Sequence, residues 1–139
     1  MILFIVGAGG ALKQVLIDSG VGNYIGELVM GANLSPLLLA WIIASVIRIA
    51  VGSATVAALT AGGIVAPLIP LTGVSPELMV LAVGAGSVIF SPPNDPGFWL
   101  FKEFFGLTVK QTVRTWCAVE TVIAVCGLIG VEVLNLFVK

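Results

Sequence analysis

The chain contains no histidine and very few charged residues. Of its 139 residues, 9% are Asp, Glu, Lys or Arg and 59% are hydrophobic, whereas soluble chains average about 25% charged residues. This composition excludes a soluble domain. The lack of histidine removes the commonest metal ligand and the usual proton carrier near neutral pH. The net charge of −1 and the lack of a basic patch argue against nucleic acid as a partner.

Cysteine is also scarce. Cys117 and Cys126 lie nine residues apart on one predicted helix, and nine steps of about 100° place them on opposite faces. They cannot form a disulfide within the chain, and they are interpreted as small apolar packing residues. With no metal-ligand spacing in the sequence, we expect neither a metal site nor an organic cofactor.

Long apolar runs dominate what remains, and mean hydropathy is +1.19. The runs do not alternate as barrel strands do, so they predict an all-α integral membrane protein. Met1–Val6 is a short apolar stub without the basic region and longer apolar core of a signal peptide. We interpret it as the end of a membrane helix that starts earlier, and expect the chain to be the C-terminal part of a larger protein.

Proline, glycine and capping residues divide the chain into five predicted segments. The last helix starts with a capping box, Thr108 with Gln111 three residues on. By the tendency of positive charge to stay inside, Lys102, Lys110 and Arg114 put the start of that helix on the cytoplasmic side. The segments are a partial helix and a re-entrant or broken element (1–34), a broken helix pair (35–71), a transmembrane helix (76–90), a loop and interfacial helix (91–107) and a transmembrane helix (108–138). For the first segment, an ordinary loop with an interfacial helix remains an alternative.

The break between two apolar runs, near Arg48, is the main candidate site. The runs before and after it are each shorter than the about 20 residues that span a bilayer, and we predict non-helical backbone over Gly52–Thr55. Interrupted, undersized segments are typical of transporter binding sites. Arg48, Gly52, Ser53 and Thr55 are therefore candidate substrate-binding residues. A kinked packing helix, whose small residues let a neighbour approach, is the alternative.

A second break, over residues 91–97, contains two prolines followed by Asn94 and Asp95. Asp95 can cap a short aromatic helix, and Asn94 is a further candidate for substrate binding. Glu120 lies within the last apolar helix. Because no histidine is available, a coupled proton would be carried by a carboxyl group whose pKa is raised by burial. Asp95, slightly preferred, and Glu120 are the candidates, although Asp95 and Asn94 can equally belong to a plain loop.

Three motifs, in this order along the chain, resemble the gluconate permease family. They are Gly9-Gly10-Ala11-Leu12-Lys13-Gln14-Val15-Leu16, Arg48-Ile49-Ala50-Val51-Gly52-Ser53-Ala54-Thr55-Val56-Ala57 and Ser91-Pro92-Pro93-Asn94-Asp95-Pro96-Gly97-Phe98-Trp99. The resemblance covers essentially the whole chain, which is similar to the C-terminal third of a member. It implies a multi-pass protein of the bacterial inner membrane that imports gluconate or a related sugar acid with protons. It also implies an inverted-repeat fold with discontinuous helices.

The resemblance thus favours one part of a secondary transporter, with a polyhydroxy carboxylate as substrate and a proton as the coupling ion. The expected partners are membrane lipid, the missing N-terminal part of the permease and a second copy of the chain. Two alternatives stay open: a small structural or regulatory membrane subunit, and a permease fragment without transport of its own. A membrane enzyme has no support, because no acid–base pair or metal-spaced ligands are recognisable.

Overall fold

Ser35 and Pro36 begin the first long helix of the described chain, as the Ser-Pro pattern predicts. The structure is a computed structural model that describes Asp18 and residues 34–138. The regular elements of these residues are all helices, which confirms the predicted helical class. The re-entrant or broken element predicted over 1–34 lies almost wholly outside the described residues.

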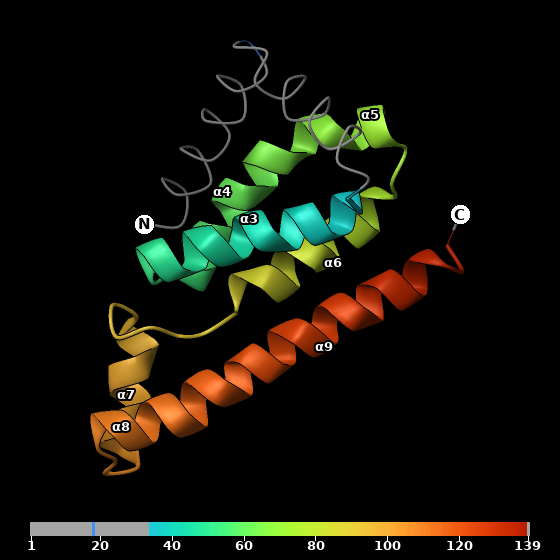
Figure 1. Ribbon diagram of the computed structural model, residues 1–139. Coiled ribbons are helices and arrows are strands. Elements are labelled where there is room, and N and C mark those ends of the chain that lie inside the picture. The colour runs from blue at the N-terminus through green and yellow to red at the C-terminus, as the bar shows by residue number, and fades with distance from the viewer. Residues whose placement is uncertain (1–17, 19–33, 139) are drawn as a thin grey trace.

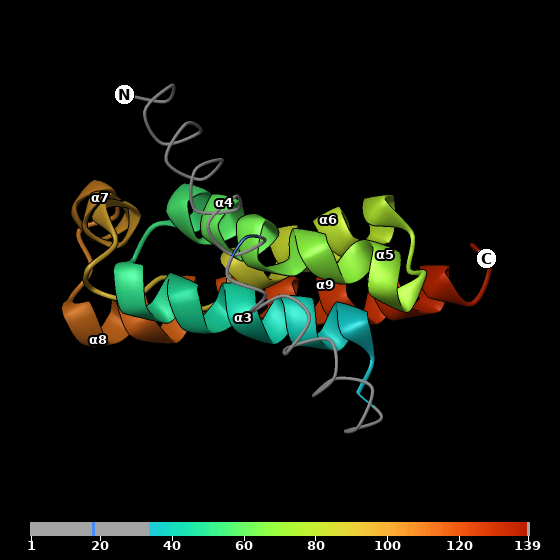
Figure 2. The same ribbon diagram turned by 90° about the horizontal axis from the view of Figure 1, so that it is seen from above.

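Helix α3 (Pro36–Val51) and helix α4 (Ala54–Val65) form a hairpin in which the chain reverses direction (Figures 1 and 2). Gly52 ends α3 with φ 77°, a left-handed conformation that glycine adopts without a Cβ clash. Ser53 is extended and caps α4. The predicted break is therefore confirmed at Gly52 and Ser53, but the prediction of non-helical backbone at Ala54 and Thr55 is wrong. Ser53 already satisfies a free N–H of the first turn, so the helix can resume at once.

The helix that begins with α4 is longer than the sequence suggests. A 3-10 turn, η1 (Ala66–Leu68), and helix α5 (Ile69–Thr72) continue it. The combined helix Ala54–Thr72 has 19 residues and is long and apolar enough to cross a membrane. The expectation of an undersized apolar segment here is wrong. Pro67 and Pro70 lie in the first two positions of η1 and α5. The changes of helix type therefore coincide with the two residues that lack a backbone N–H.

Helix α6 (Pro76–Ser87) is as short as α4, and both are shorter than α3 and α9 (Ala118–Asn135). Its 12 residues correspond to about 18 Å at a rise of about 1.5 Å per residue. It is thus shorter than the helix predicted over 76–90. An irregular segment follows, and Asp95 then caps helix α7 (Pro96–Phe104) by accepting a hydrogen bond from the Gly97 N–H.

The last helix starts at the predicted capping box. The Thr108 side chain accepts from the Gln111 N–H, and the Gln111 side chain accepts from the Thr108 N–H. The helix comprises α8 (Val109–Thr112), a π-helical turn η2 (Val113–Cys117) and α9 (Ala118–Asn135). It is continuous over 27 residues and is the second helix long and apolar enough to cross a membrane. Phe101 of α7 stacks on Trp116 of η2 at 4.7 Å between ring centroids, which joins α7 to the start of this helix.

Close contact between α3, α6 and α9 depends on glycine. A Cβ at Gly86 would lie 2.4 Å from the Trp41 carbonyl oxygen of α3, and a Cβ at Gly127 would lie 2.8 Å from Cβ of Ala85 in α6. The Trp41 indole N–H also donates to the Ala124 carbonyl of α9 at 3.0 Å. These contacts hold the end of α6 against α3 and against the middle of α9.

The core is built largely from small and aliphatic side chains, whereas many large apolar side chains face outward. The buried cluster consists of Leu37, Ala40, Ala44, Ala61, Val65, Leu68, Leu78, Met79, Ala82, Val83 and Val131. On α9 the exposed apolar residues are Val119, Val122, Ile123, Val125, Ile129, Val133 and Leu134. An apolar surface of this extent suits lipid or another apolar protein surface.

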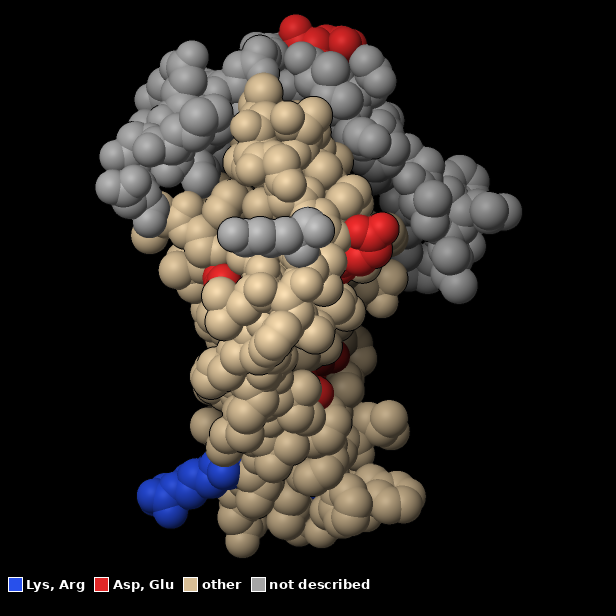
Figure 3. Space-filling view, turned by 90° about the vertical axis from the view of Figure 1, so that its right-hand side faces the viewer, with Lys and Arg blue, Asp and Glu red and all other residues tan. Residues whose placement is uncertain are grey.

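Three cationic side chains lie at one end of the described molecule, where Glu103 of α7 pairs with Lys102. Lys102, Lys110 and Arg114 belong to α7, α8 and η2, and in Figure 3 the blue side chain lies at the end where Figure 1 places α7 and α8. Acidic side chains lie farther along the same face. This distribution leaves the predicted cytoplasmic position of the α8 end as a prediction, since no membrane side is defined by the structure.

Candidate functional site

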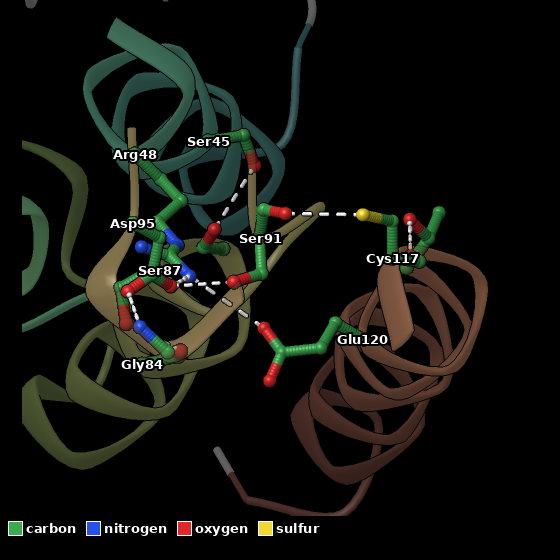
Figure 4. A network of polar contacts seen from close by, with 11 residues as sticks. Ser45, Arg48, Gly84, Ser87, Ser91, Asp95, Cys117 and Glu120 are labelled. Carbon is green, nitrogen blue, oxygen red and sulfur yellow. Dashed lines mark hydrogen bonds and ion pairs between the residues drawn. The ribbon is translucent and has the colours of Figure 1, made fainter. Parts of the chain in front are cut away.

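Arg48 lies in the last turn of α3 and is only 2% exposed. Its Nη2 donates to Oδ2 of Asp95 at 2.5 Å and lies 3.6 Å from Oε2 of Glu120 (Figure 4). We call these three residues the Arg48 cluster. A buried arginine cannot become neutral by losing its proton. The carboxylates of Asp95 and Glu120 therefore compensate its positive charge. The sequence had marked all three residues, and the structure brings them together.

The guanidinium of Arg48 is not fully satisfied. Its Nε and Nη1 are buried, and neither has a hydrogen-bond partner among the described residues. Buried donors without an acceptor cost about 1–3 kcal/mol each, and more on a charged group. The site can therefore accept further oxygen atoms from an anion.

Asp95, the N-cap of α7, accepts hydrogen bonds from three donors. Ser91 Oγ donates to its Oδ2 at 2.5 Å, the Gly97 N–H donates to its Oδ1 at 2.7 Å, and Arg48 donates to Oδ2. Burial raises the pKa of Asp95, but the hydrogen bonds from Ser91, Arg48 and Gly97 outweigh it and bring the pKa below its ordinary value. The raised pKa expected from the sequence is therefore wrong for Asp95.

Glu120 is held far more loosely. It lies in the first turn of α9, and its distance of 3.6 Å to Arg48 is that of an ion pair rather than of a direct hydrogen bond. Its side chain is 17% exposed, against 3% for that of Arg48. In Figure 4 it reaches from α9 toward the segment that carries Asp95.

Asn94 and Gly52 fasten this segment to the tip of the hairpin. The Asn94 amide donates to the carbonyl of Ala50 at 3.2 Å and to that of Ile49 at 3.5 Å, so it caps the last turn of α3. A Cβ at Gly52 would lie 2.7–2.8 Å from Asn94, including its backbone. In this arrangement Asn94 acts on the α3 backbone, although sequence analysis had singled it out for substrate binding.

Ser53 and Thr55 lie beside the Arg48 cluster in the chain but do not join it. The Ser53 hydroxyl accepts from the Val56 N–H at 3.4 Å. Thr55 is exposed in the first turn of α4. In the part of the chain that the structure describes, no hydrogen bond links either hydroxyl to the cluster.

Sequence analysis overlooked Ser91 and Cys117. Ser91 is fully buried, donates to Asp95 and, through its carbonyl, accepts from the Cys117 thiol at 3.0 Å. Ser91 stands four residues before Asp95 in the motif quoted above, and that spacing could have suggested it. No signal pointed to Cys117. Over residues 34–138 and Asp18, no group of three or more His, Cys, Asp or Glu is placed to hold a metal ion.

The chain matches the family model of the GntP family permeases over residues 1–137. It is 64% identical over 138 residues to a high-affinity gluconate transporter of Escherichia coli K12, with 99% of this chain and 32% of the relative covered. It is 60% identical to an L-idonate transporter of the same organism, covering 97% of this chain and 31% of the relative. A gluconate permease of Bacillus subtilis is 55% identical, covering 99% and 31%.

The chain thus spans about a third of the length of these relatives. No solved structure matches it. The family match covers nearly every residue, including the hairpin tip and all three residues of the Arg48 cluster. The chain therefore belongs to the GntP family of permeases.

Proposed function

We propose that this chain forms one part of a membrane transporter that carries gluconate or a related sugar acid together with protons. Its relatives are named for gluconate and L-idonate, both of which are polyhydroxy carboxylates. The observation that carries the proposal is the buried Arg48, which has two unpartnered N–H groups among the described residues and two acids beside it. Such an arrangement suits a site that exchanges carboxylates.

In this proposal, Arg48 binds the carboxylate of the substrate through charge-assisted hydrogen bonds. The N-terminal end of α4, which begins at Ala54 after its N-cap Ser53, adds free backbone N–H groups and a positive dipole end. Ser53, Thr55 and Asn94 are the nearby groups that can bond the hydroxyls of a sugar acid.

Asp95 and Glu120 are the proposed proton carriers of this part of the protein. In a protein of the relatives' length, about two thirds of the chain lies outside the segment matched here. In this proposal that part supplies the other half of an inverted-repeat site in the bacterial inner membrane, as re-entrant or discontinuous helices do in other transporters. The described apolar surface of α9 then faces lipid or that other part. We also propose that the whole transporter assembles as a homo-oligomer.

Substitution of Arg48 by lysine tests the proposal. The chain replaces the matching segment of the E. coli high-affinity gluconate transporter, to which it is 64% identical; we call the product the chimeric transporter. Lysine keeps the charge but loses the planar, two-pronged geometry. A buried charge-assisted contact contributes about 1.5–3 kcal/mol, so gluconate affinity should fall about ten- to a hundredfold.

Arg114→Lys is the matched control, because Arg114 is exposed on η2. It should leave gluconate binding by the purified chimeric transporter unchanged. Wild-type affinity in Arg48→Lys would remove Arg48 from the substrate site. A chimeric transporter that inserts but neither binds nor transports gluconate would contradict the proposed function itself.

A further inference from the structure

The geometry points to Glu120 as the carboxylate that leaves Arg48 when the substrate arrives, and it leaves as a neutral acid. Asp95 stays in place throughout. This inference rests on the proposed function and deepens it: it decides between the two candidate proton carriers, and it explains why the substrate and the proton must bind together.

The shape of the guanidinium makes Nη2 the contested atom. A carboxylate that binds with both oxygens uses either Nε with Nη2 or Nη1 with Nη2, because only these pairs of N–H groups are parallel. Nε and Nη1, the two donors without partners among the described residues, point to different edges and cannot hold one carboxylate between them. A two-pronged contact with the substrate must therefore share Nη2, which both acids now approach.

Asp95 is the acid that cannot easily leave. Two of its three donors, Ser91 Oγ and the Gly97 N–H, have nothing to do with Arg48. Moving Asp95 would also uncap α7, which typically costs about 1 kcal/mol. Among the described residues, the polar contact of Glu120 is the longer one of 3.6 Å with Nη2. It can swing away without uncapping a helix.

The net charge of the Arg48 cluster then requires that Glu120 take up a proton. The groups that face Glu120 are Arg48 from α3, Asp95 from the segment before α7 and Cys117 on its own helix, whose thiol donates to Ser91 and is neutral. With both acids ionised, the cluster carries +1 and −2, which gives −1. A monoanionic substrate would raise this to −2 in a largely buried site.

Protonation of Glu120 restores the charge of −1. The proton comes from water and binds a carboxylate oxygen of Glu120, the ion pair with Nη2 is lost, and the substrate carboxylate takes its place. No covalent bond of the substrate changes. A single proton therefore accompanies each monoanion.

Glu120→Gln tests the inference, with Glu132→Gln as the matched control. Glu132 lies on the same helix but accepts a hydrogen bond of 2.6 Å from the Ser35 hydroxyl, far from Arg48. The chimeric transporter is placed in lipid vesicles, and two rates are measured: gluconate accumulation driven by a pH gradient, and exchange of labelled for unlabelled gluconate at equal pH. Glu120→Gln mimics the protonated acid, so it should lose accumulation but keep exchange. Glu132→Gln should keep both, and Asp95→Asn should lose both.

Proton uptake on gluconate binding gives a second readout that does not need transport. The wild-type chimeric transporter should take up a proton from weakly buffered solution when it binds gluconate, and Glu120→Gln should take up none. If Glu120→Gln does not purify folded, Glu120→Asp replaces it. That change withdraws the carboxylate by one methylene, so the midpoint pH of gluconate binding should shift, whereas Glu132→Asp should not shift it.

Three outcomes would overturn the inference while leaving the proposed function intact. They are proton-driven accumulation or proton uptake in Glu120→Gln, an unshifted midpoint in Glu120→Asp, and exchange without accumulation in Asp95→Asn. The last result would make Asp95 the carrier. Failure of the proposed function is distinct, because the wild-type chimeric transporter would then not transport gluconate at all.

Discussion

The two glutamates of α9 lie at opposite ends of the helix and have different partners. Glu120, near the start of α9, faces the buried guanidinium of Arg48. Glu132, near its end, accepts a 2.6 Å hydrogen bond from the hydroxyl of Ser35. Both are partly buried, and their partners lie at opposite ends of α3: Ser35 is its N-cap and Arg48 lies in its last turn.

The difference shows that an acid in an apolar helix acquires its role from its neighbour. A serine hydroxyl can donate to a carboxylate or accept from a carboxylic acid, so Glu132 can be satisfied in either state. An arginine remains positive and favours the ionised acid. Protonation therefore changes the contacts of Glu120 with Arg48, whereas it need not change the contact between Glu132 and Ser35.

The largest expected effect comes from removing the cation at the Glu120 end. Arg48→Leu leaves Asp95 and Glu120 largely buried without their positive partner, which typically costs about 3–5 kcal/mol of unfolding free energy. Thermal unfolding of the purified chimeric transporter measures it. Adding Glu120→Gln to Arg48→Leu should recover part of the loss. If Arg48→Leu is no more harmful than Ser35→Ala, the contrast between the two ends does not hold.

Gly52→Ala should have the next largest effect, because it strikes the hairpin tip that positions Arg48. Gly73→Ala is its matched control, since both residues end a helix with positive φ, 77° and 69°. Alanine in that conformation costs about 1–2 kcal/mol. At Gly52 the new Cβ also meets Asn94 at 2.7 Å, whereas at Gly73 nothing lies within 4 Å. The loss of unfolding free energy in Gly52→Ala should therefore exceed that in Gly73→Ala by about 1–3 kcal/mol. Equal losses would mean that Asn94 can move away from the new Cβ without cost.

A smaller effect is expected between the two ends, where α6 meets α3. Gly86→Ala places a Cβ 2.4 Å from the Trp41 carbonyl, and overpacking of this kind costs about 1–3 kcal/mol. Gly84→Ala, two residues away in open space, should be neutral or stabilising by up to about 1 kcal/mol. The two variants are compared by thermal unfolding. Similar values for both would show that α3 and α6 can separate without loss of stability.

The smallest effect is expected at the Glu132 end. Ser35→Ala removes one hydrogen bond to Glu132, worth about 1 kcal/mol. Gluconate accumulation by the chimeric transporter should be unchanged within error, because the charge of the Arg48 cluster is untouched. A loss of accumulation in Ser35→Ala comparable to that in Glu120→Gln would contradict the difference between the two glutamates.

Local features were the ones that the sequence could predict. Asp95-Pro96 and the Thr108–Gln111 box specify helix starts through their own side chains, and both starts are observed. The position of the hairpin break was also predictable, because Gly52 permits positive φ. Its direction was not, because a Gly-Ser break does not say whether the next helix continues or turns back.

Contacts between distant residues were beyond sequence reasoning. Arg48 meets Glu120 because Gly86 and Gly127 let α3, α6 and α9 approach closely. The hydrophobic periodicity of a sequence does not predict which helices pack against each other in this way. The π-helical turn over Val113–Cys117 has no sequence signal that we recognised. The pKa of Asp95 was mispredicted because burial was considered without the three donors that oppose it.

The length of the last helix has an electrical consequence. The 27 residues of Val109–Asn135 extend about 40 Å, and Glu120, eleven positions after Val109, lies about 16 Å along the helix. A helix of this length, centred in a hydrocarbon layer about 30 Å thick, places Glu120 about 11 Å into the layer. One charge that reaches this depth crosses somewhat more than a third of the membrane potential, or about 0.9 kcal/mol per 100 mV. A proton on Glu120 and a monoanion on Arg48 cross the same fraction with opposite sign, so a pH gradient should drive the loading of the cluster and voltage should not.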